Sequence, residues 1–177
     1  AGCSHLCDLR NAQGGIRYRG SGEATPSVTN WTGRPEIGGK FFFGEHTLIS
    51  ASSMSVLLVD DQASIRSILR NSLIQLGFVR VSGVRNGVEA LEHLQDNATH
   101  LIISDFNMPD MDGLALLRAV RANPKTARTG FIMLTGQASK ELVQQAITDG
   151  VNNFLAKPFT TSSLKSRIEA VFGPISA

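Results

Sequence analysis

From residue 54 onward, the sequence alternates five times between a short apolar run and a longer stretch with apolar residues at helical spacing. Buried strands that alternate with amphipathic helices are typical of a parallel sheet with helices on both faces. Glycine or proline follows four of the helical patterns and marks where each helix ends. The apolar runs cover residues 56–59, 79–81, 101–104, 131–134 and 153–156.

Right-handed crossovers leave few ways to connect five such units. Their number and length predict an α/β fold of the flavodoxin-like (βα)5 type, a doubly wound parallel sheet with strand order 2-1-3-4-5. In the fourth helical pattern, the residues that we expect to face the sheet are Leu142, Val143, Ala146 and Ile147.

Residues 1–53 differ in composition from the rest of the chain. They hold nine of the 17 glycines, both cysteines and the only Trp, and their apolar residues show no regular period. We predict that 1–53 is a disordered or loosely structured extension and that 54–177 is the folded domain. Met54 is then a candidate for the natural start. Cys3, His5 and Cys7 lack a second cluster at zinc spacing, so we predict no metal site there.

Net charge and hydropathy exclude several classes of function. The net charge is +2 with both signs spread along the chain, which gives no electrostatic footprint for nucleic acid. No apolar stretch is long enough to span a bilayer, and the start of the chain has no secretory pattern. Residues 54–177 contain no cysteine, which argues against a disulfide framework. We therefore expect a cytoplasmic protein that does not insert into a membrane.

Polar side chains follow four of the five predicted strands. Asp60 and Asp61 come after the first strand, Asp105 after the third, Thr135 after the fourth and Lys157 after the fifth. Because the carboxyl ends of parallel strands meet at one edge, we expect these groups to converge. Crowded carboxylates favour a hard divalent cation such as Mg²⁺. An ammonium and a hydroxyl beside them are suited to a phosphoryl group, and the product would be an aspartyl phosphate.

Each of these residues also has an ordinary structural explanation. Asp60 or Asp61 could cap the following helix, Thr135 could belong to a turn, and Lys157 before a proline is commonly a surface residue. Only their joint occurrence at four strand ends favours a site.

The pattern resembles the receiver domain of two-component response regulators, most closely the single-domain, CheY-like type of chemotaxis proteins. The resemblance covers about residues 54–173. Four pieces carry it: Val59-Asp60-Asp61, the stretch from Ser104 to Gly113 (SDFNMPDMDG), Leu134-Thr135-Gly136 and Ala156-Lys157-Pro158-Phe159.

The resemblance implies a role for each matching residue. Asp105 is the phosphoacceptor, assisted by Lys157 and Thr135. Asp60, Asp61, Asp105 and the carbonyl of Asn107 hold Mg²⁺. Phe154 takes the position of a switching aromatic residue, and Asn107 and Gln137 occupy positions that tune the lifetime of the phosphoryl group.

The implied function is that of a signalling switch, not an enzyme with external turnover. A histidine kinase donates the phosphoryl group, and a downstream protein binds the face formed by the fourth helix, fifth strand and fifth helix. We expect no direct contact with nucleic acid, because the given sequence shows no recognition helix or basic stripe for DNA.

Three alternatives compete with this interpretation. A haloacid-dehalogenase-type hydrolase needs an acid two residues after its nucleophile, where Ala63 and Asn107 stand here. A flavodoxin needs a phosphate-binding loop after the first strand, where the chain is acidic. A phosphorylation-independent interaction module of the pseudo-receiver type stays open, although such modules typically lose the acidic pair or the lysine.

Overall fold

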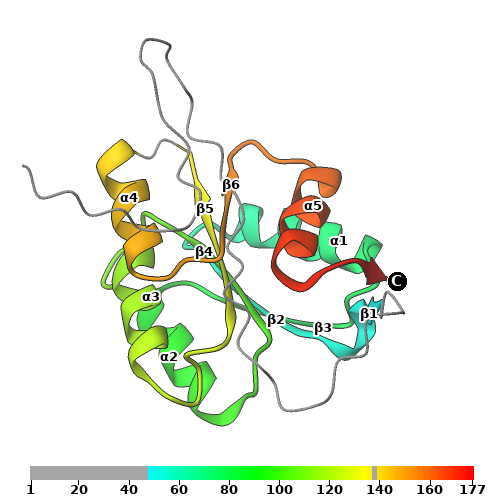
Figure 1. Ribbon diagram of the computed structural model, residues 1–177, viewed down its shortest axis with the longest axis horizontal. Coiled ribbons are helices and arrows are strands. Elements are labelled where there is room, and N and C mark those ends of the chain that lie inside the picture. Colours follow the sequence, from blue (N-terminus) through cyan, green and yellow to red (C-terminus); the bar gives the residue numbers. More distant parts are fainter. Residues whose placement is uncertain (1–47, 137–138) are drawn as a thin grey trace, which may run out of the picture. The chain divides into compact units, whose positions relative to one another are not determined.

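The computed structural model describes residues 48–136 and 139–177. A parallel sheet of five strands in the order β3-β2-β4-β5-β6 forms its centre (Figure 1). This order is the predicted 2-1-3-4-5, so the α/β prediction is confirmed. The strands of this sheet are β2 (Ser55–Val59), β3 (Arg80–Val84), β4 (Leu101–Asp105), β5 (Gly130–Thr135) and β6 (Asn153–Ala156). The helices are α1 (Ala63–Gln75), α2 (Gly87–Asp96), α3 (Gly113–Ala122), α4 (Lys140–Thr148) and α5 (Thr161–Phe172).

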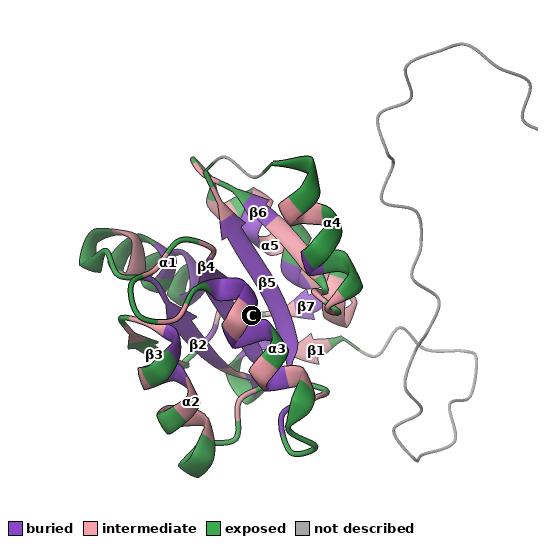
Figure 2. Ribbon diagram, turned by 90° about the vertical axis from the view of Figure 1, so that its left-hand side faces the viewer, coloured by how far each residue is buried: buried purple, intermediate pink, exposed green. Residues whose placement is uncertain are grey.

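Helices cover both faces of this sheet (Figure 1). One face packs against α1 and α5 through Leu69, Leu73, Leu164 and Ile168, and the other packs against α2, α3 and α4. Successive strand residues point to opposite faces, so Leu58 joins the first layer while Leu57 and Val59 join the second. The central strands are therefore mostly apolar and almost entirely buried, as Figure 2 shows for β2 and β5. None of the helices in the two described ranges is long and apolar enough to cross a membrane.

Glycines end three helices where the sequence predicts it. Gly77, Gly150 and Gly173 follow α1, α4 and α5 and have φ between 88° and 92°, a region that favours glycine. The expected inward face of α4 is only partly correct, because Ala146 is buried but Ile147 is 50% exposed.

The fold begins before Met54. A short strand, β1 (Ile49–Ser50), pairs in parallel with β7 (Ile175–Ser176), and a 3-10 turn (Ala51–Ser53) follows it. Ala51 is fully buried in the layer that faces α1 and α5. The predicted boundary at residue 54 is thus wrong by several residues, because a two-residue strand leaves no periodic pattern in the sequence. The predictions for residues 1–47, Cys3, His5 and Cys7 among them, lie outside the described residues, and a natural start at Met54 stays a prediction.

We expect the segment before Met54 to contribute to stability. Ala51→Asp in the full chain should lower the free energy of unfolding by about 3 kcal/mol, because it places a carboxylate in an apolar layer. Ser52→Asp is the matched control, since Ser52 is exposed and its change should stay within about 0.5 kcal/mol. Urea denaturation of both variants measures the difference. Equal effects at the two positions would show that the segment does not pack as described.

Candidate functional site

Four strands deliver polar side chains to one edge of the central sheet. Asp60 and Asp61 directly follow β2, and Asp105 is the last residue of β4. Thr135 ends β5 and pairs in register with Ala156, next to Lys157. The Lys157 N–H donates to the Thr135 carbonyl at 2.8 Å, which fixes the lysine at this edge. The expected convergence of strand ends is therefore seen in the structure.

Asp60, Asp61 and Asp105 form an acidic cluster. Each offers a carboxylate oxygen, and these oxygens lie within 4.8 Å of one another. Asp60 is fully buried and Asp105 nearly so, whereas Asp61 is exposed. The ammonium of Lys157 bridges the two buried members, at 2.9 Å from Asp60 Oδ2 and 3.1 Å from Asp105 Oδ1.

Asp60 is held by groups from three directions. Its Oδ1 accepts the Gln62 N–H at 2.8 Å, and its Oδ2 accepts from Lys157. Its main-chain carbonyl accepts from the guanidinium of Arg66 on α1. From the sequence alone, Arg66 is expected to be a solvated surface residue, as arginines on amphipathic helices ordinarily are. No local pattern connects it with Asp60.

The main chain fixes Asp105. This residue pairs with Leu134 in the β4–β5 ladder, and the next N–H, of Phe106, donates to the Leu134 carbonyl at 3.1 Å. Gly113 closes the following loop with an N–H bond of 2.9 Å to the Phe106 carbonyl. A Cβ at Gly113 would lie 2.3 Å from the Asp105 carbonyl oxygen, so only glycine fits there.

The environment shifts the pKa of two site residues. Burial raises the pKa of the Asp105 carboxyl, and the hydrogen bond and charge of Lys157 offset this only in part. Burial opposes the charge of Lys157, but hydrogen bonds from its ammonium to Asp60 and Asp105, and attraction to both carboxylates, raise its pKa. Lys157 is therefore charged at neutral pH, and an ionised Asp105 costs stability in the absence of another cation.

We expect Asp105→Asn to stabilise the metal-free protein at neutral pH. An acid whose pKa is raised by folding contributes stability that is complete below its unfolded-state pKa and is lost as pH rises through the folded-state value. The asparagine carries no charge and avoids that loss. The variant should therefore unfold at a higher urea concentration than wild type at pH 7, and this gap should close as pH falls to about 4, near the ordinary pKa of an aspartate.

Urea denaturation with a chelator present, at a series of pH values, measures this gap. Asp96→Asn is the control, because Asp96 is exposed at the end of α2. A variant that is less stable than wild type at neutral pH would contradict the burial argument.

Two further predicted site residues, Asn107 and Phe154, lie within the described part of the chain. Asn107 is exposed in the loop between β4 and α3, two residues after Asp105. Phe154 lies in β6 beside Met133 and packs, half-buried, against the core layer that faces α2, α3 and α4. Gln137 lies outside the described residues.

The acidic cluster has the chemistry of a magnesium site. Its donors are carboxylate oxygens, which hard divalent cations prefer, and magnesium keeps several waters of its own. Three carboxylates and one ammonium leave two negative charges, which a divalent cation would balance. The residues present therefore fit Mg²⁺.

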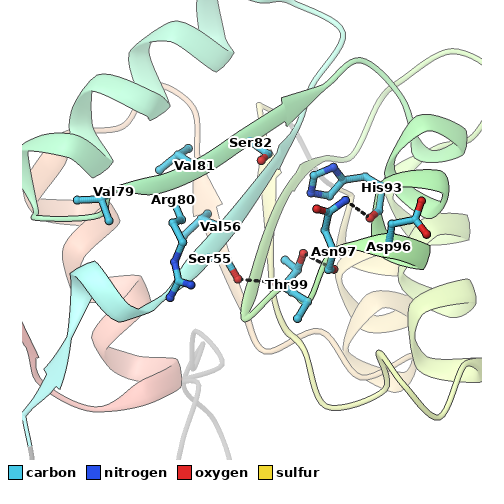
Figure 3. Close-up of a pocket in the computed structure, with 11 residues that line it drawn as sticks. Ser55, Val56, Val79, Arg80, Val81, Ser82, His93, Asp96, Asn97 and Thr99 are labelled. Carbon is cyan, nitrogen blue, oxygen red and sulfur yellow. Dashed lines mark hydrogen bonds between the residues drawn. The ribbon is translucent and has the colours of Figure 1, made fainter.

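A hollow of about 540 Å³ lies at the opposite edge of the sheet, where β2 and β3 begin and α2 ends (Figure 3). Some of its polar groups bond one another. Ser55 Oγ donates to the Ala98 carbonyl at 2.7 Å, and Asn97 Nδ2 donates to the His93 carbonyl at 2.9 Å. This hollow holds no cluster of carboxylates comparable with the site at the strand ends.

Comparisons with known proteins agree with this geometry. The family profile described as response regulator receiver domain matches residues 56–169. A probable chemotaxis protein CheY of Rhizobium etli is 47% identical over 125 residues, which cover 71% of this chain and 97% of the relative. Chemotaxis protein CheY1 of Helicobacter pylori is 43% identical over 121 residues, covering 68% of this chain and 98% of the relative.

Solved structures show the same fold. Chemotaxis response regulator CheY4 of Vibrio cholerae superposes with a TM-score of 0.63 at 36% identity, over 67% of this chain and 99% of that protein. The receiver domain of a sensor histidine kinase from Pseudomonas aeruginosa has a TM-score of 0.62 at 28% identity, over 68% of this chain and 98% of its own. That second structure has a magnesium ion coordinated in its active-site cleft.

Proposed function

Since the chain belongs to the family of response regulator receiver domains, we propose that it takes a phosphoryl group from a histidine kinase onto Asp105. The chain is a phosphoaccepting response regulator, a signalling protein and not a classical enzyme. The observation that carries the residue assignment is the pairing of a nearly buried Asp105 with Lys157 at 3.1 Å, inside a cluster of three carboxylates.

The transfer is a single displacement at phosphorus. A carboxylate oxygen of Asp105 forms the new O–P bond while the N–P bond of the kinase's phosphohistidine breaks. The electron pair stays on the imidazole nitrogen, which then takes up a proton. Loss of the phosphoryl group to water later resets the switch, and both steps occur at the site of this chain.

Each neighbour of Asp105 has a part in this proposal. Lys157 offsets the negative charge of the phosphoryl oxygens, and the Thr135 hydroxyl donates a hydrogen bond to one of them. Asp60, Asp61, Asp105 and the Asn107 carbonyl would hold Mg²⁺. When bound, the metal neutralises charge on the phosphoryl group. Asn107 and Gln137 tune how long the phosphoryl group stays.

The output is a change of one protein-binding face. Phosphorylation adds charge and acceptor oxygens at the strand ends, and Thr135 moves toward them. The space that Thr135 leaves admits the ring of Phe154, and the face formed by α4, β6 and α5 changes with it. A protein partner that prefers the changed face then binds. Similarity to CheY proteins points to chemotaxis as the pathway, and we place the exchange in the cytoplasm.

A small phosphodonor tests the proposal without a kinase. With an acyl phosphate such as acetyl phosphate and Mg²⁺, the purified protein should gain one phosphoryl group, and a chelator should abolish the gain because three carboxylates then repel the donor. Intact-mass spectrometry follows both reactions. A protein that stays folded with Mg²⁺ and gains nothing would instead be a phosphorylation-independent interaction module.

A further inference from the structure

The loop between β4 and α3, residues 106–112, contains a strained turn. Asp110 has φ of 67°, in the left-handed region that residues other than glycine rarely adopt. The Met111 N–H donates to the Pro109 carbonyl at 2.7 Å and closes this turn. Such a conformation persists only where the surrounding structure holds it.

The start of α2 supplies the first hold on this turn. Asn86 Nδ2 donates to Asp110 Oδ2 at 3.1 Å. The Oδ1 of the same amide accepts the Glu89 N–H at 2.9 Å and caps α2. These two bonds orient the amide, since its oxygen serves the helix and its nitrogen serves the loop. The Arg85 N–H donates to Glu89 Oε2, which braces the turn that carries Asn86.

The second hold is a close contact between Gly87 and Met111. A Cβ at Gly87 would lie 2.6 Å from Met111 Cγ and 2.9 Å from its Cβ, so the methionine rests directly on the α2 main chain. Met111 also packs against the core layer of α2, α3 and α4. Helix propensity alone disfavours glycine at Gly87, the first residue of α2. The contact with Met111 therefore explains why glycine occupies this position.

Asn107 lies between two fixed ends of this loop. Gly113 presses against the Asp105 carbonyl at the base, and Asn86 and Gly87 hold Asp110 and Met111 at the tip. Asn107 itself is exposed. Its position relative to the acidic cluster therefore depends on the two holds.

We propose that Asn86 and Gly87 are positioning residues for the Asp105 site, which hold the loop from α2 and so place the Asn107 carbonyl for the metal. This rests on the proposed function, in which that carbonyl is a ligand of Mg²⁺. Neither residue touches the reacting atoms. Their effect reaches the site through the loop alone.

Asn86→Asp in the full-length protein tests the first hold. Aspartate keeps the capping oxygen for α2 but sets a carboxylate against Asp110. Amide hydrogen exchange in residues 106–112 should become faster, and the Kd for Mg²⁺ should rise about fivefold to tenfold, the size of one ordinary hydrogen bond lost. The added negative charge would by itself strengthen magnesium binding, so a weaker affinity separates positioning from simple electrostatics.

The double variant Asn86→Asp/Asp110→Asn provides the rescue. It exchanges donor and acceptor, restores the hydrogen bond and returns the net charge to that of wild type. Mg²⁺ affinity and loop exchange should come back to within about twofold of wild type. Asn97→Asp is the matched control, since it places the same change at the other end of α2 and should leave loop exchange unaltered.

Gly87→Ala tests the second hold. In this variant we expect α2 to become more stable while Mg²⁺ binding becomes weaker. Alanine favours α2, yet its Cβ must displace Met111, so Mg²⁺ should bind about threefold to tenfold more weakly although the helix is stronger. Gly83→Ala is the control, because its Cβ meets only ordinary contacts, the nearest at 3.6 Å to Arg66 Cδ.

Calorimetric titration with Mg²⁺ and hydrogen exchange without metal give independent readouts. Unchanged loop exchange in Asn86→Asp and Gly87→Ala would overturn the proposal, and so would faster exchange with wild-type Mg²⁺ affinity. Failure of the proposed function looks different: wild-type protein would then neither bind Mg²⁺ nor take up a phosphoryl group. In that case a ligand role for Asn107 is lost, and the positioning proposal is overturned with it.

Discussion

The Asp105→Asn variant is expected to take up no phosphoryl group from an acyl phosphate, a loss of at least about a hundredfold in rate. An amide of the same shape replaces the carboxylate that forms the O–P bond, so the nucleophile is lost and the fold is kept. Lys157 and Asp60 still lie at the same sheet edge, but neither replaces that oxygen in its position at the end of β4.

Asp96→Asn is the control for this loss, because it removes a carboxylate outside the site and should react like wild type. Intact-mass spectrometry at several times after mixing gives both rates. Wild-type incorporation by Asp105→Asn would show that another residue accepts the phosphoryl group. Urea denaturation of this variant at neutral pH, where we expect a higher stability than that of wild type, tests whether unfolding is the reason for its inactivity.

Lys157→Met is expected to lower the free energy of unfolding by about 3 kcal/mol when a chelator is present. The ammonium bonds Asp60, which is fully buried, at 2.9 Å, and methionine leaves that carboxylate with the Gln62 N–H as its remaining hydrogen bond in the described structure. Removing one partner of a buried ion pair leaves the other charge uncompensated, which is the cause of the expected loss.

Magnesium should reverse most of this loss. Lys157 and the metal compete for the same carboxylates, so Lys157→Met should bind Mg²⁺ about tenfold more tightly and regain stability as the ion saturates the site. Lys165→Met is the control, since Lys165 forms only an exposed pair with Glu169 at 3.8 Å and should change stability by less than about 1 kcal/mol. Urea denaturation of both variants, once with a chelator and once with Mg²⁺, measures these changes in the free energy of unfolding. An equal loss in both variants would contradict the counter-ion role.

The sequence is sufficient to predict the sheet and the convergence of polar side chains at one of its edges, because both depend on repeated patterns. Five apolar runs followed by helical patterns determine the strand order, and parallel strands bring Asp60, Asp105 and Lys157 to one edge. Periodicity is less informative at the border of a helix face. Ile147 continues the apolar pattern of α4 but lies half-exposed, since a helix buries only part of its circumference.

Contacts between single residues far apart in the sequence were not predictable. β1 and β7 each have two residues and pair across most of the folded chain, so neither leaves a periodic apolar pattern in the sequence. The bond between Asn86 and Asp110 joins two loops through one pair of polar side chains, and Asn86 alone indicates only a helix cap. Likewise, Arg66 reaches the Asp60 carbonyl from a helix whose surface pattern is ordinary. Such contacts follow from tertiary packing and not from local preference.

The position of the phosphoryl group tests the central claim most directly. Wild-type protein is treated with acetyl phosphate and Mg²⁺, the aspartyl phosphate is reduced with borohydride, and the product is mapped by peptide mass spectrometry. We predict that the reduced residue is Asp105, at the end of β4. Reduction at Asp60 or Asp61, with Asp105 intact, would contradict the account.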